Sequence, residues 1–86
     1  MRIYQATVSN PRYCVTEHDT AEAAATEVET AGSGNVVQFI RSPNAPDRLP
    51  KFVDRSAALW SYQDGKWYRH AIFDGLGSIL AEERPN

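Results

Sequence analysis

Cysteine and histidine are the side chains of this sequence that could carry nucleophilic chemistry, and the chain has Cys14, His18 and His70. A cysteine–histidine pair acts only when the ring lies within hydrogen-bond reach of the sulfur and a third group orients the ring. Cys14 and His18 share one face of a predicted strand but lie about 13 Å apart along it. From these residues no nucleophile, base and orienting group can be assembled. We therefore predict a protein without catalytic residues, which is not an enzyme, with Cys14 as a small strand residue.

Metal and cofactor sites also lack a recognisable pattern. Two separated histidines and one cysteine match no zinc-ligand spacing. The acidic residues form no paired-carboxylate arrangement. The run Gly32-Ser33-Gly34 follows a predicted helix, whereas a phosphate-binding loop opens one. We expect no metal and no cofactor.

The size and composition of the chain limit the function further. Its 86 residues predict a single domain, 1–86, with one modest core. No apolar run approaches the length of a membrane span, and the first residues show no signal-peptide stretch. A single cysteine fits a reducing compartment, and the net charge of −2 gives no general attraction to polyanions. We expect a cytoplasmic protein that does not contact membranes.

The charges are unevenly distributed along the sequence. Residues 17–29 hold five acids and no lysine or arginine, whereas residues 41–69 hold six bases and three acids. Two interpretations stay open: two solvated faces, or a dipolar surface whose basic side meets a partner.

A strong local signal comes from Asp64-Gly65, which lies between two aromatic-rich runs. A two-residue Asp-Gly loop favours a type I′ hairpin, because both central residues need positive φ. The hairpin pairs residues 57–63 with 66–73, and its predicted register is Tyr62–Trp67, Ser61–Tyr68, Trp60–Arg69 and Leu59–His70. We assign Trp60, Trp67 and Phe73 to the core. The outer face then carries Tyr68, His70 and Ile72, either as an exposed patch typical of a partner surface or covered by a loop through Phe52 and Val53.

The remaining elements are predicted from the hydrophobic periodicity and from the turn, capping and proline residues between them. Residues 2–9 and 12–18 predict two strands that turn at Asn10-Pro11, with Val8 opposite Tyr13 and Cys14, Thr16 and His18 on the polar face. Asp19 is the predicted N-cap of a helix from about Thr20 to Ala31, which Gly32 ends. Residues 35–41 predict a third strand. Three prolines make 42–55 a long loop, and residues 76–86 form a short tail or an extra strand.

These elements predict an α+β fold. It is a single two-layer domain, with an antiparallel sheet of five strands, or six, in the order β-β-α-β-β-β, and one alanine-rich helix packs on one face. The cations gather on the loop and the hairpin, and loops on a rigid sheet often carry function. Because arginine and tyrosine dominate many interfaces, we predict a partner-binding surface there. Its residues are Arg48, Lys51, Arg55, Lys66, Tyr68 and Arg69.

The run from Leu59 to Trp67 (Leu-Trp-Ser-Tyr-Gln-Asp-Gly-Lys-Trp), after a short alanine-containing helix, resembles small phage-encoded anti-CRISPR proteins that act on type I surveillance complexes. The resemblance covers the element order over about residues 2–73. It implies a non-catalytic inhibitor in the host-cell cytoplasm that binds a CRISPR effector subunit and blocks target DNA recognition. Lys66 and its neighbours would then contact a Cas protein. The long loop at 42–55 and the tail after Asp74 depart from the pattern.

Three classes of function therefore stand against one another. A protein-binding inhibitor binds a defined protein in a way that survives salt. A small nucleic-acid-binding or regulatory module would use the basic loop and the aromatic hairpin, and its binding would fall steeply with salt. An enzyme would need a concave polar pocket that holds His18 or His70. We predict the first class, with a protein partner and no cofactor.

Overall fold

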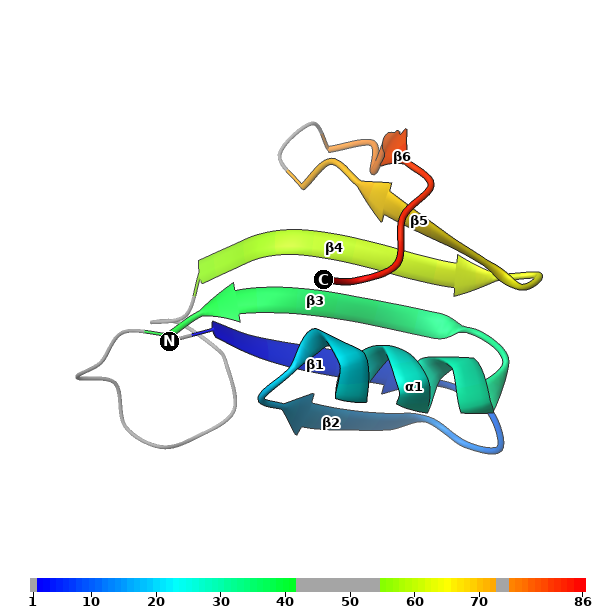
Figure 1. Ribbon diagram of the computed structural model, residues 1–86. Helices are drawn as coiled ribbons and strands as arrows, with labels where there is room; N and C mark the ends of the chain where they lie inside the picture. Colours follow the sequence, from blue (N-terminus) through cyan, green and yellow to red (C-terminus); the bar gives the residue numbers. More distant parts are fainter. Residues whose placement is uncertain (1, 42–54, 73–74) are drawn as a thin grey trace.

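A six-stranded antiparallel sheet carries one helix on one of its faces (Figure 1). The structure is a computed structural model that describes residues 2–41, 55–72 and 75–86, except for the side chain of Arg55. The strands lie side by side in the order β2-β1-β3-β4-β5-β6. This is the predicted α+β fold, with the sixth strand present. The elements are β1 (Arg2–Val8), β2 (Cys14–His18), α1 (Ala21–Ala31), β3 (Gly34–Ile40), β4 (Arg55–Gln63), β5 (Lys66–His70) and β6 (Ile79–Ala81).

The central hairpin, β4 and β5, has the predicted register. Tyr62 pairs with Trp67, and the pairing continues through Trp60–Arg69 to Leu59–His70. Asp64 and Gly65 have φ values of 54° and 78°, as a type I′ turn requires. This part of the fold is determined locally, because the turn residues fix the register of both strands.

The pairing of β1 with β2 differs from the prediction by one residue. Val8 lies opposite Cys14, where Tyr13 was expected, and Ala6 lies opposite Thr16. The connection is longer than the Asn10-Pro11 turn, since β1 ends at Val8 and β2 begins at Cys14. A shift of one residue turns every side chain of a strand to the other face. Thr16 and His18 therefore face the helix, and Tyr13 is 73% exposed.

Helix α1 begins one residue later than predicted and ends as predicted. Thr20, and not Asp19, is the N-cap: its side chain accepts a hydrogen bond from the Ala23 N–H at 3.2 Å. Gly32 is the left-handed C-cap. The predicted apolar stripe packs on the sheet, with Ala24, Ala25 and Val28 buried.

The helix covers only part of the sheet, over β1, β2 and β3. The C-terminal segment, residues 82–86, crosses β4 on the same face as α1 (Figure 1). Its Glu83 accepts a hydrogen bond from the Trp60 indole at 3.1 Å and donates its backbone N–H to the Trp67 carbonyl oxygen at 3.1 Å. Trp60 and Trp67 are 1% and 6% exposed. The assignment of these two tryptophans to the core is confirmed, although the tail as well as the helix lies on their face of the sheet. Phe73, which was also assigned to the core, lies outside the described residues.

Candidate functional site on the outer face of the sheet

Strand alternation leaves a polar and aromatic group of side chains on the face away from α1. Among the described residues, no helix or strand packs over this part of the sheet. We call the group the outer patch. Its members on β3, β4 and β5 are Asn35, Leu59, Ser61, Gln63, Lys66, Tyr68 and His70. Leu59, Ser61, Tyr68 and His70 are half-buried, whereas Asn35, Gln63 and Lys66 are exposed.

The predicted binding residues are only partly brought together by the fold. Lys66 and Tyr68 share the outer face of β5, whereas Arg69 points to the opposite face, because neighbouring strand residues alternate. Arg69 pairs there with the carboxylate of Glu83 at 3.8 Å. Arg55 begins β4, at the far end of the hairpin from Lys66. Arg48 and Lys51 lie outside the described residues.

A serine and a histidine meet in the outer patch. The Ser61 Oγ lies 2.6 Å from the Nε2 of His70, and the His70 Nδ1 lies 2.7 Å from the carbonyl oxygen of Gly77. A carbonyl oxygen only accepts, so Nδ1 carries a hydrogen and donates it. In the neutral ring, Nε2 is then the acceptor for the Ser61 hydroxyl. The segment after β5 thus orients the histidine, and the histidine holds the serine.

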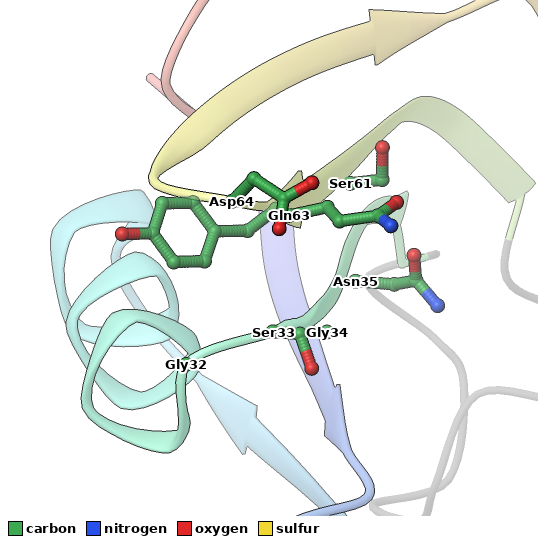
Figure 2. Close-up of a pocket in the computed structure, with 8 residues that line it drawn as sticks. Gly32, Ser33, Gly34, Asn35, Ser61, Gln63 and Asp64 are labelled. Atoms are coloured by element: carbon green, nitrogen blue, oxygen red, sulfur yellow. The ribbon is translucent and has the colours of Figure 1, made fainter.

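The serine lines an open polar hollow of about 570 Å³ at the end of the sheet next to the C-terminus of α1. In Figure 2, Ser61, Gln63 and Asp64 border it from β4 and its turn, and Asn35 of β3 and the preceding Ser33 border it from the other side. Asn35 and Ser61 are cross-strand neighbours, so both side chains stand on the same face. The hollow therefore presents a hydroxyl beside an amide.

The histidine lines a second hollow of about 460 Å³ with a different character. Its walls are mainly apolar, and they are formed by Ala57, Ala58, Arg69, Ala71, Ile72 and Leu80 besides His70. His70 thus lines the apolar hollow, while its hydrogen-bond partner Ser61 lines the polar one.

The other histidine lies on the helix side and has a structural role. The Glu27 carboxylate of α1 accepts a hydrogen bond from the Thr16 hydroxyl and lies 2.5 Å from the His18 Nε2. The hydrogen bond from Thr16 lowers the pKa of Glu27, although partial burial opposes the shift. These contacts tie β2 to α1. Cys14 is exposed and forms no disulfide within the chain.

The acidic helix makes further internal contacts. Arg84 donates two hydrogen bonds to Glu29, at 2.9 and 3.0 Å, and another to Glu22. Trp67 also donates its indole N–H to Glu29 at 2.8 Å. The bonds from Arg84 are the main cause that lowers the pKa of both Glu22 and Glu29. Glu22 and Glu29 therefore hold the tail, as Glu27 holds β2, and these contacts make the helix face a structural element.

Neither a cluster of metal ligands nor a membrane-spanning helix occurs among the described residues. No group of three or more histidine, cysteine and acidic residues among them could hold a metal ion. No helix among them is long and apolar enough to cross a membrane.

Comparisons with known proteins add no assignment. No protein-family model matches the chain, and searches of curated proteins and of solved structures returned no match.

Sequence reasoning missed the Ser61–His70–Gly77 cluster, although part of its signal was present. The predicted register pairs Leu59 with His70 and so places Ser61 diagonally from His70. Diagonal neighbours on one face of a hairpin lie within reach of a long side chain. The Gly77 carbonyl could not be foreseen, because its position depends on the turn between β5 and β6.

Proposed function

We propose that the protein is a binding module that inhibits a larger assembly by covering a protein surface with its outer patch. The observation that carries this proposal is the contrast between the two faces of the sheet. The carboxylates Glu22, Glu27 and Glu29 of the helix face have partners within the chain, whereas the outer patch has no helix or strand over it among the described residues.

The composition of the outer patch favours a protein partner. Its centre holds Leu59, Tyr68 and His70, and its margin holds the amides of Asn35 and Gln63. An apolar and aromatic centre with a polar rim is typical of protein interfaces. Lys66 is the cation of this patch and makes no ion pair within the described part of the chain. We infer a partner surface with an apolar centre and a carboxylate that meets Lys66.

A nucleic-acid partner has less support. Binding to a phosphate backbone draws on several lysine or arginine contacts. Of the cations between residues 41 and 69, Arg41 pairs with Glu17 at 3.3 Å and Arg69 pairs with Glu83. Within the described part of the outer patch, Lys66 alone is left to neutralise a phosphate. The contribution of Arg48, Lys51 and Arg55 stays a sequence-based prediction.

The candidate partner is a subunit of a type I CRISPR effector complex in the host cytoplasm. This identification rests on the resemblance of the Leu59–Trp67 run to anti-CRISPR proteins, and the hairpin that carries the run has the predicted register. In this proposal, the bound protein prevents the complex from recognising its target DNA.

Capture from the native host, with and without nuclease, tests the class of partner. The tagged full-length chain is incubated with lysate at low and at raised salt, and retained proteins are identified by mass spectrometry. We expect a defined protein that remains after nuclease treatment and at raised salt. Loss of capture after nuclease treatment, or a steep decrease with salt, would assign the protein to the nucleic-acid-binding class.

A reconstitution assay tests the identity of the partner. The protein is added to a purified type I surveillance complex, and binding of a target duplex is measured by mobility shift. Target binding should decrease as the protein concentration rises. Unchanged target binding at saturating protein would exclude this partner and leave the capture result to name another.

A further inference from the structure

We propose that Ser61, His70 and the Gly77 carbonyl form an acyl-transfer site in which Ser61 accepts an acyl group from an ester. This activity goes beyond the binding function proposed above and does not depend on it. The substrate class is an ester of a small acyl group with an apolar alkyl or aryl alcohol. Three observations support it: the direction of the hydrogen bonds, the access to the serine, and the two hollows that Ser61 and His70 line.

The hydrogen-bond order is the one that activates a serine. The Ser61 hydroxyl lies 2.6 Å from the His70 Nε2, and the His70 Nδ1–H donates to the Gly77 carbonyl oxygen at 2.7 Å. A general base must hold its free nitrogen toward the nucleophile, and a third group must fix the tautomer and orientation of the ring. The Gly77 carbonyl fixes both, because it can accept only the hydrogen on Nδ1.

A substrate can reach the serine from the polar hollow of about 570 Å³. Asn35 lines the same hollow and is the cross-strand neighbour of Ser61, with both side chains on one face (Figure 2). An ester carbonyl attacked by a serine develops a negative charge on its oxygen, and amide N–H groups stabilise that charge. Asn35 is therefore the group placed to donate a hydrogen bond to the oxyanion.

The apolar hollow gives the preference for the alcohol. His70 lines this hollow of about 460 Å³, together with side chains such as Ile72 and Leu80. A general base returns the proton to the leaving oxygen, so the leaving group lies on the histidine side of the serine. An apolar leaving group would be accommodated there, and the small acyl group would face the polar hollow.

The reaction is balanced without any other reactant than water. The Ser61 Oγ forms a bond with the carbonyl carbon while its proton moves to the His70 Nε2. The bond between that carbon and the leaving oxygen then breaks, and the leaving oxygen takes the proton from His70. Water attacks the acylated Ser61 with His70 again as base, which releases the carboxylic acid and restores the hydroxyl.

The test uses the full chain and p-nitrophenyl acetate, an ester of a small acyl group with an aryl alcohol. Release of p-nitrophenolate is followed by absorbance, and the intact protein and its peptides are analysed by mass spectrometry after acid quenching. The variants are Ser61→Ala and His70→Gln, and the matched control is Ser56→Ala on the same strand. Thermal unfolding of each variant is measured alongside.

We expect one acetyl group on the Ser61 peptide of the wild-type protein. For Ser61→Ala, the rate of hydrolysis should fall to the background rate that free imidazole and lysine give with the same ester. For His70→Gln, the rate should fall by about 100-fold or more, since a general base contributes about that much. Ser56→Ala should keep the wild-type rate. Acetylation spread over lysines with none on Ser61, or a wild-type rate equal to that of folded Ser61→Ala, would overturn the proposal.

Acetylation of Ser61 in the wild-type protein decides the question even if a variant fails to fold, because it needs no substitution. The same Ser61→Ala protein separates this activity from the binding function. Retained partner capture with lost hydrolysis would support both proposals. Lost capture with retained acetylation of wild-type Ser61 would place the partner on the same serine and leave the acyl-transfer site intact.

Discussion

Gly65 and Gly34 differ in what an added methyl group would meet. At Gly65 the φ is 78° and a Cβ would find no atom within 4 Å, so the cost of Gly65→Ala is the backbone conformation alone. We expect a loss of about 1 kcal/mol in the free energy of unfolding. At Gly34 a Cβ would clash with the Thr7 carbonyl oxygen of β1 and lie 3.2 Å from Val28 Cγ1 of α1. Gly34→Ala should therefore cost about 2 kcal/mol or more, because sheet and helix must move.

Equilibrium unfolding in urea measures both substitutions in the same buffer. The two losses can be compared directly with each other, since each variant adds one methyl group to a glycine. A larger loss for Gly65→Ala than for Gly34→Ala would mean that the close approach of β3 to β1 and α1 is not present in solution.

Individual side chains also differ in how well their orientation could be predicted from the sequence. Trp60 and Trp67 were assigned to the core because their face of the hairpin carries large side chains that match the small residues of the alanine-rich helix, and both are buried. Thr16 and His18 were assigned to a polar outer face, and instead they contact Glu27 of α1. Their orientation depended on the length of one connection, which the Asn10-Pro11 pair does not determine.

At the scale of elements, the C-terminal segment is held to the helix by Arg84. Its guanidinium bonds Glu29 through two nitrogens, and such paired bonds are stronger than single ones. The Arg84 side chain is 37% exposed, so solvent weakens the interaction. We expect Arg84→Ala to lower the free energy of unfolding by about 1 kcal/mol. The exposed Arg12 provides the matched control, and Arg12→Ala should change stability little; equal losses in urea unfolding would contradict this role of Arg84.

The pH dependence follows from the same contacts. The pKa values of Glu22, Glu27 and Glu29 lie below the ordinary value of 4.5 in the folded protein. A carboxyl with a lowered pKa contributes stability above its unfolded pKa and loses it as the pH falls through its folded pKa. Stability should therefore decrease below pH 4.5.

The difference between the wild-type protein and Arg84→Ala adds a sharper test of that pH dependence. It should shrink between about pH 7 and about pH 3, because Glu22 and Glu29 take up protons as the pH falls through their lowered pKa values, and a protonated carboxyl no longer attracts the guanidinium. Urea unfolding at the two pH values measures it. A difference that stays constant would show that Arg84 acts by packing and not by charge.

The elements also differ in how far they could be predicted. The β4–β5 hairpin and the end of α1 at Gly32 follow from signals within a few residues, and both are confirmed. The tail is a short strand followed by a segment that crosses the tryptophans. Its contacts join residues far apart in sequence, as in Arg84 with Glu29 and Tyr4 with the Asn86 carbonyl at 3.4 Å. No local pattern specifies such contacts.

In the whole molecule, the acids that make the charge of the sequence asymmetric mostly form ion pairs within the chain. The acids of residues 17–29 were expected to form a solvated face or one side of a dipolar surface. Glu17, Glu22, Glu27 and Glu29 instead have partners within the chain. Among the described residues, these contacts disfavour a function in which the acidic helix imitates the charge of nucleic acid, and they are consistent with the proposal that a partner binds the outer patch.

Two double variants, each of which reverses the charge of one cation and truncates one tyrosine, test whether a partner binds the outer patch. Lys66→Glu with Tyr68→Ala alters the outer patch, and Arg12→Glu with Tyr13→Ala alters the exposed loop between β1 and β2. Affinity for the captured partner is measured by titration calorimetry, after thermal unfolding has shown that both variants fold. The outer-patch variant should lose about 2 kcal/mol or more of binding free energy, and the loop variant should bind like the wild-type protein. Normal binding by the outer-patch variant, with loss in the loop variant, would contradict this proposal and place the interface at the connection between β1 and β2.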